Sequence, residues 1–495
     1  MRQIADFHIH SKYSRACSSQ LTLGNIEKAC RVKGVDIIAT GDFTYPEWFL
    51  SIKNELEEAP VLSLRAKPPR RSEAISVVAP TEIASSSRGG TPRNDSSLYR
   101  LKKSTDNEIK FIFSTELALI YKDGDRARRI HIVVHAPNIK AVEDLNKYLD
   151  KKYNIRSDGR PILGMKSPDL VKLCLSIHPK FLIYPAHIWT PWFSVFGSKS
   201  GFDTMEECFK DQTENIYAYE TGLSSDPEMN WRLSALDKLT LLSNSDAHSL
   251  PNIAREANVF ELENGTYDEI YNVIKNKIVI PTRHGEESLK DDSASSKGSL
   301  ATLGMTKEKN LKIPPALNVC GGENGLKYTI EFYPEEGMYH FDGHRSCGVS
   351  FTPAQSKKNK NICPVCKKPL TIGVMNRIEK LADRLEGFVP KNMPGFKKLV
   401  ELDKIIAEAM DIKLRSSLKV QVIYNDLIKR LGSELYILMD APISDIKNIS
   451  PAVAEGVKRV REGKLIIKPG FDGQYGTVKI FSEEEKEKNK QASLF

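Results

Sequence analysis

The sequence predicts an α/β fold with a mainly parallel sheet. Short apolar runs with β-forming residues alternate with a helix-like segment, and the joints between them are short. Potential metal ligands stand within or directly after these runs. Functional groups of parallel α/β folds gather at the carboxyl ends of strands, so this placement indicates a functional site in the first half of the chain.

The first predicted strand leads into a pair of histidines, His8 and His10, with Ile4, Phe7 and Ile9 around them. Side chains alternate across a strand, so both imidazoles share one face and form half of a metal site. For an isolated motif of this kind, two surface histidines near a chain end are the alternative.

The next elements keep the same rhythm. The spacing predicts a helix over 22–34, which Thr22 can cap and Gly34 ends. Further strands are expected in five apolar runs: 35–40, 111–116, 130–134, 181–187 and 240–246. A helical pattern dominates after residue 375, and two short β-like runs near the end suggest a closing hairpin.

Two polar stretches divide the chain. Residues 60–105 are rich in Pro, Ser, Arg and Gly, which indicates a flexible insertion. We expect the chain to divide into these parts: an α/β domain at 1–284, a linker at 285–318, a small Cys-containing domain at 319–375, a mainly helical domain at 376–482 and a tail at 483–495.

The composition narrows the class of protein. The chain has 495 residues and a formal net charge of +8, which suits a polyanionic partner. No apolar run approaches the roughly 20 residues of a membrane span, and no signal peptide is expected. The eight cysteines are scattered except for one close pair, which favours metal binding in a cytoplasmic protein over disulfides.

The candidate ligands in the first half are histidines and carboxylates. They are His8, His10, Asp42, Glu116, His131, His187, Asp246 and His248. This mixture suits Zn, Mn or Fe better than Ca, and so many ligands exceed the needs of one ion. A single histidine at a strand end is more often an ordinary polar residue, so the argument rests on the whole set.

These residues, in this order, resemble the motifs of the PHP (polymerase and histidinol phosphatase) superfamily. The resemblance implies a distorted (β/α)7 barrel with up to three ions. It assigns one ion to His8, His10, Glu116 and Asp246, a second to Glu116, His131 and His187, and a third to Asp42 and His248. His135 is an alternative to His131, whose spacing from Glu116 fits the family motif better. The chain departs from the family at Asp42, where an imidazole is usual.

The chemistry expected of this barrel is phosphoester hydrolysis. Two ions a few ångströms apart bridge a phosphate oxygen and lower the pKa of bound water, so that hydroxide attacks phosphorus. His8, His10, Glu116 and Asp246 are the residues expected to carry catalysis, with Mg²⁺ or Mn²⁺ supporting activity.

A second metal site is predicted in the small domain. His344, Cys347, Cys363 and Cys366 have the spacing of a closed, structural zinc site. His340 is an alternative to His344 as the imidazole ligand. Lysines flank the Cys363–Cys366 pair, as in zinc ribbons that contact the nucleic-acid backbone, although a solvated charged face is the simpler reading.

The order of PHP barrel, zinc ribbon and helical C-terminus resembles the endonuclease Q family of archaeal and bacterial DNA-repair nucleases. The matching stretches are 40–48, 190–203, 339–347 and 460–464. The resemblance implies a nick on the 5′ side of a deaminated base (uracil, hypoxanthine or xanthine) or an abasic site. The candidates for contact with DNA are Arg15, Trp192, Phe193, Phe196, Ser198, Lys199 and Phe202, and ordinary packing is the alternative for each aromatic one.

The last residues include Gln491, Leu494 and Phe495, which resemble a shortened sliding-clamp-binding motif. A fraying chain end is the alternative. Two other functions are possible for the whole chain: a PHP phosphatase for a small phosphomonoester, or a nucleic-acid-binding adaptor with an inactive barrel.

Overall fold

The computed structural model describes residues 1–60, 97–104, 109–280, 325–391 and 393–485. The predicted linker at 285–318 and the tail residues Gln491, Leu494 and Phe495 lie outside the described residues, as does most of the insertion predicted at 60–105. None of the helices in the described ranges is long and apolar enough to cross a membrane.

Seven strands follow one another around an irregular barrel, in which regular strand pairing is interrupted at two places. They are β1 (Arg2–Asp6), β2 (Ile37–Ala39), β5 (Lys110–Asp123), β6 (Arg126–Ala136), β8 (Leu182–Pro185), β9 (Ala218–Glu220) and β10 (Thr240–Leu242). Beyond the regular strands, Ile188 N donates to Glu220 O at 3.1 Å and joins β8 to β9. His10 N donates to Ala247 O at 3.1 Å and closes the ring between β10 and β1. The predicted α/β fold class is confirmed.

One part of the barrel differs from the predicted parallel sheet. β5 and β6 form a long antiparallel hairpin with its turn at Gly124, and β8 is antiparallel to β6. Ala118 pairs with His131, so Glu116 is a diagonal neighbour of His131 on the same face. These two candidate ligands therefore lie within a hairpin, and the expectation that they follow the ends of parallel strands was wrong.

Helices cover the outside of the barrel. They include α1 (Leu23–Lys33), α2 (Pro46–Glu55), α3 (Ile139–Asp150), α4 (Ser167–Ile177) and α7 (Tyr267–Lys275). The helix predicted over 22–34 is α1, and Gly34 ends it in the left-handed conformation with φ 88°. Thr22 occupies the N-cap position, but its side chain makes no capping hydrogen bond. Shorter elements complete this half: β3 (Leu56–Glu58), β4 (Tyr99–Leu101), β7 (Ile162–Leu163), α5 (Met205–Phe209) and α6 (Pro227–Asn230).

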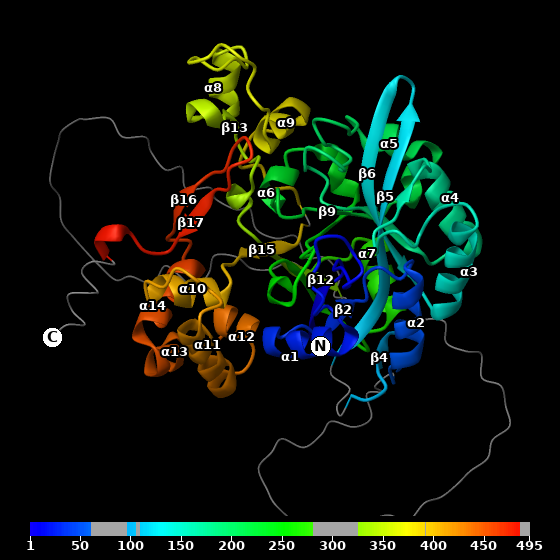
Figure 1. Ribbon diagram of the computed structural model, residues 1–495, viewed down its shortest axis with the longest axis horizontal. Coiled ribbons are helices and arrows are strands. Elements are labelled where there is room, and N and C mark those ends of the chain that lie inside the picture. Colours follow the sequence, from blue (N-terminus) through cyan, green and yellow to red (C-terminus); the bar gives the residue numbers. More distant parts are fainter. Residues whose placement is uncertain (61–96, 105–108, 281–324, 392, 486–495) are drawn as a thin grey trace, which may run out of the picture.

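The large sheet continues from β1 into the second half of the chain. β11 (Ala257–Glu261) pairs with β1, β12 (Gly325–Glu331) pairs with β11, and β15 (Gly395–Lys398) pairs with β12. Between β12 and β15 the chain forms a small lobe, built from β13 (Asp342–His344), β14 (Val349–Phe351), α8 (Pro353–Lys358) and α9 (Val374–Leu381). This lobe lies at the top of Figure 1.

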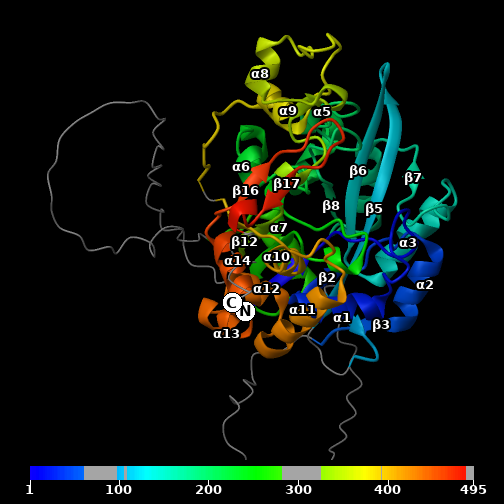
Figure 2. The same cartoon turned by 60° about the vertical axis from the view of Figure 1, so that its left-hand side comes forward.

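The C-terminal region is mainly helical, as predicted. It contains α10 (Leu402–Ala409), α11 (Leu418–Leu431), α12 (Glu434–Met439), α13 (Ile443–Ile449) and α14 (Pro451–Arg461). The predicted closing hairpin is β16 (Ile466–Lys468) with β17 (Thr477–Lys479). Its turn reaches the small lobe, where Phe341 N donates to Gly470 O, so this hairpin links the helices to the lobe (Figure 2).

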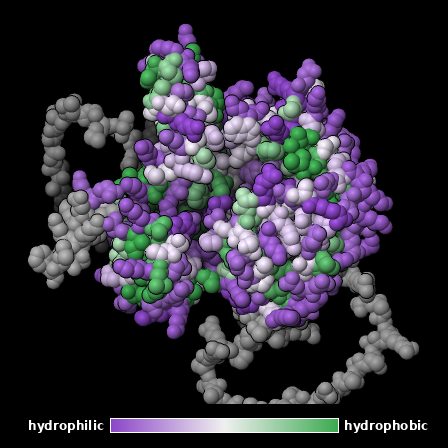
Figure 3. Space-filling view, viewed as in Figure 1, coloured by the Kyte–Doolittle hydropathy of each residue, from purple (hydrophilic) through white to green (hydrophobic). Residues whose placement is uncertain are grey.

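The surface facing the viewer in Figure 3 is mainly hydrophilic, and its hydrophobic residues form small, separate patches. The apolar side chains of the barrel strands instead form one continuous core between the sheet and the helices.

Candidate metal centre

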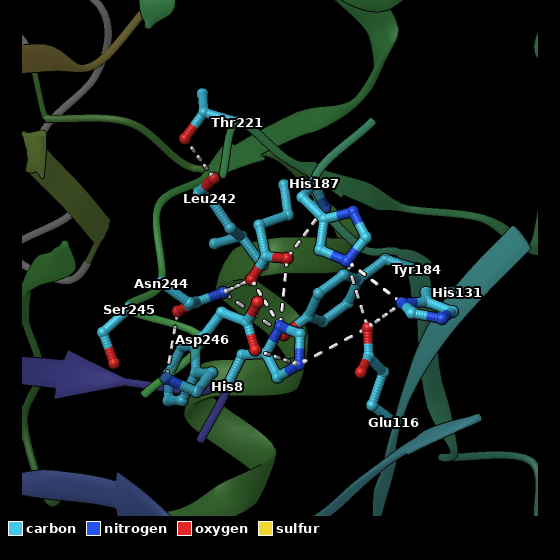
Figure 4. A network of polar contacts seen from close by, with 12 residues as sticks. His8, Glu116, His131, Tyr184, His187, Thr221, Leu242, Asn244, Ser245 and Asp246 are labelled. Atoms are coloured by element: carbon cyan, nitrogen blue, oxygen red, sulfur yellow. Dashed lines mark hydrogen bonds and ion pairs between the residues drawn. The ribbon is translucent and has the colours of Figure 1, made fainter. Parts of the chain in front are cut away.

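The first group of candidate ligands lies at one end of the barrel. The side chains of His8, His10, Glu116 and Asp246 place one ligand atom each within 4.8 Å of one another. The two histidines follow β1, and Asp246 follows β10, so barrel closure between these strands brings them together. Figure 4 shows His8, Glu116 and Asp246 pointing toward one another.

The second group shares Glu116 with the first. Its other members, His131 and His187, come from β6 and from the loop after β8. Oε1 of Glu116 lies 2.8 Å from His131 Nδ1 and 3.2 Å from His187 Nε2, and Oε2 lies 3.4 Å from His10 Nε2. One buried carboxylate thus connects both groups, which suits a pair of bridged ions.

His135, the alternative to His131, is in neither group. Its Nε2 lies 3.0 Å from the hydroxyl of Tyr184, and its ring is fully buried. The structure therefore brings His131, and not His135, next to Glu116.

Outer partners orient the inner imidazoles. Nδ1 of His8 lies 3.1 Å from both carboxylate oxygens of Glu220, and Nδ1 of His10 lies 3.0 Å from Asp42 Oδ1. These contacts leave Nε2 of each ring for the centre of the cluster, the arrangement usual for histidines that bind metal.

The donor set fits divalent cations. Nε2 of His8 is buried without a hydrogen-bond partner among the described residues. It lies 3.8 Å from Glu116 Oε1 and 3.8 Å from Asp246 Oδ1, too far for hydrogen bonds. A cation among these three atoms would satisfy all of them.

The electrostatics of the cluster support this interpretation. Burial lowers the pKa of His8, but the carboxylates of Glu220 and Glu116 outweigh it and raise that pKa well above its ordinary value. Burial raises the pKa of Glu116, whereas the neighbouring His131 and Arg160 lower it well below its ordinary value. The carboxylates thus favour positive charge in the cluster, and a divalent cation can supply it in place of the protons on the histidines.

Three of the candidate ligands have a strained backbone. Asp42, His187 and Asp246 have φ values of 47°, 27° and 46°, in the left-handed region that non-glycine residues seldom adopt. Such strain persists only where surrounding contacts hold it, and it gathers at functional sites.

Asp42 and His248, the ligands predicted for a third ion, do not form a third group of candidate ligands among the described residues. Asp42 is fully buried, and its Oδ2 accepts from Ser11 N at 2.6 Å, Ser11 Oγ at 2.7 Å and Ser14 Oγ at 2.9 Å. His248 Nδ1 instead donates to the carbonyl oxygen of Asp246. Among the described residues, neither side chain belongs to a group that could hold an ion.

Two residues of the centre were missed by the sequence analysis. Glu220 ends β9, a short apolar strand, so the strand-end rule applied to the other ligands could have found it. Arg160 lies in a loop without a recognisable motif, and its Nη1 donates to Glu116 Oε2 at 2.9 Å.

The predicted DNA contacts fall into two classes. Arg15, Ser198 and Lys199 are exposed, Trp192 is 38% exposed, and the Phe193 ring lies 4.5 Å from the ring of His131. Phe196 and Phe202 belong to the hydrophobic core, where a base cannot stack on them. The burial of these two rings favours the packing alternative.

The four residues predicted to bind zinc meet in the small lobe. His344, Cys347, Cys363 and Cys366 place their ligand atoms within 4.8 Å of one another. Cys366 Sγ lies 3.7 Å from His344 Nδ1. This distance agrees with the spacing of about 3.4–3.8 Å between the ligand atoms of a tetrahedral zinc at the usual bond lengths. His340 is buried outside this group.

Two solved structures match nearly the whole chain. The lesion-specific endonuclease PfuEndoQ from Pyrococcus furiosus is 26% identical, with a TM-score of 0.72 over 98% of this chain and 97% of that one. A complex of endonuclease Q with a 27-mer duplex substrate that has an abasic lesion at the active site is also 26% identical, with a TM-score of 0.71 over 98% of both chains. The chain therefore has the fold of endonuclease Q.

Sequence relatives match smaller parts. Residues 401–464 match the family described as the MJ0043 C-terminal domain. The protein MJ0043 of Methanocaldococcus jannaschii is 28% identical over 294 residues, which are 59% of this chain but only 31% of that protein. The protein YqxK of Bacillus subtilis is 26% identical over 71% of this chain and 74% of its own length.

Proposed function

We propose, from its likeness to endonuclease Q along almost the whole chain, that this protein is a metal-dependent DNA repair endonuclease. It nicks the phosphodiester on the 5′ side of a lesion, either a deaminated base (uracil, hypoxanthine or xanthine) or an abasic site. The abasic-lesion duplex bound at the active site of a structural neighbour supports DNA with damaged bases as the substrate class. An archaeal or bacterial cytoplasm suits this role.

The observation that carries the proposal is the single buried carboxylate of Glu116, which two groups of candidate ligands share. When bound there, divalent ions such as Zn²⁺, Mg²⁺ or Mn²⁺ polarise a phosphoryl oxygen and acidify water, so that hydroxide can attack phosphorus.

The protein's own residues prepare the centre for this chemistry. Glu220 and Asp42 hold the rings of His8 and His10 so that Nε2 of each faces inward. Asp246 lies 3.0 Å from His10 and is one-fifth exposed, so it borders the open side of the centre. The barrel encloses the other ligands, which keeps the cluster's charges in a low dielectric and strengthens their pull on cations.

DNA binding is proposed for exposed residues of the loop that carries Phe193, whose ring lies 4.5 Å from the ring of His131. Ser198 and Lys199 offer a hydroxyl and a cation for phosphates, and Trp192 offers a ring for stacking on a base. The lysines beside the zinc-binding group are proposed as further contacts to phosphates. The zinc-binding group itself is proposed to hold a structural Zn²⁺ ion. Gln491, Leu494 and Phe495 are proposed to bind the sliding clamp.

The test uses 5′-labelled duplexes that carry one uracil, hypoxanthine or abasic site, with Mg²⁺ or Mn²⁺ added. We expect a cut directly 5′ of the lesion, and an undamaged duplex of the same sequence is the control. Equal cutting of both duplexes, or of neither, would overturn the proposal. Release of phosphate from a small phosphomonoester alone would favour the phosphatase alternative, and lesion binding without cleavage would favour the adaptor.

A further inference from the structure

A positively charged side chain stands beside the shared carboxylate of the metal centre. Arg160 Nη1 donates to Oε2 of Glu116 at 2.9 Å, on the side of the carboxylate that also faces His10. The Arg160 side chain is 24% exposed, so it reaches solvent as well as the buried carboxylate. A guanidinium has five N–H donors, of which this bond uses one.

The loop that carries Arg160 is fixed at its start. Gly159 N donates to Tyr13 O at 3.0 Å, and Asp158 Oδ1 accepts from the backbone N–H groups of Arg15 and Arg160. The chain then continues into β7, which pairs with β5. The hydrogen bonds before Arg160 and the pairing of β7 after it therefore fix the backbone from which the Arg160 side chain reaches Glu116.

Gly159 also covers the residue predicted to bind a third ion. A Cβ atom at this position would lie 2.5 Å from Asp42 Oδ2 and 2.4 Å from Ser14 Oγ, so only glycine allows this approach. Oδ1 of Asp42 is in contact with His10, and Oδ2 accepts three hydrogen bonds. Asp42 is thus enclosed and fully used in positioning other groups.

We propose that Arg160 supplies the third positive charge of this centre, in place of a third ion, and donates to a non-bridging oxygen of the phosphate bound there. This inference rests on the proposed function for the identity of that phosphate, a DNA phosphodiester. A guanidinium suits the role because it stays charged and binds phosphate oxygens through paired N–H groups. Asp42 positions His10 and is not a metal ligand.

The first measurement is the number of ions bound per chain, by elemental analysis of the full-length protein after equilibration with Zn²⁺ or Mn²⁺ and dialysis. We expect one ion for each of the three ligand groups. An additional ion that is lost in Asp42→Asn would overturn the inference.

The second measurement compares Arg160→Gln with a matched control, Arg156→Gln, whose side chain is exposed and pairs with Asp150 at the surface of the same region. In Arg160→Gln the ion content should stay unchanged, and binding of inorganic phosphate, followed by calorimetry, should be lost. Single-turnover nicking of an abasic duplex should fall by about 100-fold or more. Arg156→Gln should match the wild type in all three, and Arg160→Lys should recover part of the phosphate binding.

Loss of ions from both Arg160→Gln and Arg160→Lys would show that the Arg160–Glu116 pair is only structural. Wild-type phosphate affinity in Arg160→Gln would equally overturn the inference. If the wild type cuts no DNA, the proposed function fails, but the ion count and the phosphate titration still decide the role of Arg160.

Discussion

Nδ1 of His8 lies 3.1 Å from each of the two carboxylate oxygens of Glu220, which stands at the end of β9. The same carboxylate accepts from His187 N at 2.9 Å, so it supports one candidate ligand from each of the two groups. No motif in the sequence connects these residues, and only closure of the barrel brings them together.

This contact predicts that Glu220→Gln weakens ion binding in the barrel. A neutral amide orients the His8 ring less firmly than the carboxylate and removes the negative charge next to His8 Nδ1. The ion affinity should therefore fall about 10- to 100-fold. Competition with a fluorescent chelator measures the affinity. Glu263→Gln, at an exposed position after β11, is the control and should bind ions like the wild type. Equal affinity in Glu220→Gln would show that the contact has no role in ion binding.

Asp246→Asn should abolish nicking and leave DNA binding unchanged. The substitution removes one carboxylate of the first ligand group but keeps the size of the side chain. Cleavage of a labelled abasic duplex measures the first property, and a gel-shift titration in Ca²⁺ measures the second. If binding is lost together with cleavage, Asp246 holds the structure of the site and does not act in the reaction.

Much of the fold was predictable because local patterns determine it. α1 begins and ends where Thr22 and Gly34 predict, and the closing hairpin forms from its two β-like runs. The candidate ligands of the first two predicted ions met in the expected groups, whereas Asp42 and His248 did not form a third. The spacing of His8 and His10 already predicted that these two side chains would share one face. Their roles as ligands stay predictions.

The remaining features depend on contacts between distant segments. The β5–β6 hairpin was missed because its two apolar runs are separated by polar, charged residues that belong to long strands. Arg160 and Glu220 reach the centre only through the closed barrel. Phe196 and Phe202 are buried by the packing of their loop, and an aromatic-rich sequence does not reveal which rings stay exposed.

The zinc-binding group allows a direct test of its imidazole ligand. His344→Ala should lower the zinc content by one ion per chain and destabilise the small lobe, because a structural zinc contributes to folding. His340→Gln changes the buried histidine outside the group and should keep that zinc. The zinc content of both variants is measured as the zinc released by a thiol reagent. Loss of zinc from His340→Gln but not from His344→Ala would assign the imidazole ligand to His340.

Arg377 of α9 anchors the small lobe to the barrel. Its Nε donates to Phe196 O at 2.9 Å, and its Nη2 donates to Phe202 O at 2.8 Å and to Asp203 at 2.6 Å. Arg377→Met leaves two buried carbonyl groups without these donors, so the free energy of unfolding should fall by roughly 3 kcal/mol.

Urea denaturation measures the change caused by Arg377→Met. Lys380→Met, at an exposed position of the same helix, is the control. Hydrogen exchange should also speed up in the loop over 196–203 of Arg377→Met. A variant as stable as the wild type, with unchanged exchange, would mean that other contacts dock the lobe.

Glu331 at the end of β12 should make the stability depend on pH. Burial raises the pKa of its carboxyl group from 4.5 to about 8. Between these values the folded protein keeps a proton that the unfolded chain releases, so the contribution of Glu331 to stability is complete below pH 4.5 and falls as the pH rises toward 8. Glu331→Gln removes this contribution, so the free energy of unfolding should fall less between pH 4.5 and pH 8 in the variant than in the wild type. Denaturation at pH 5, 6.5 and 8 measures both slopes, and equal slopes would show that Glu331 is ionised in the folded protein.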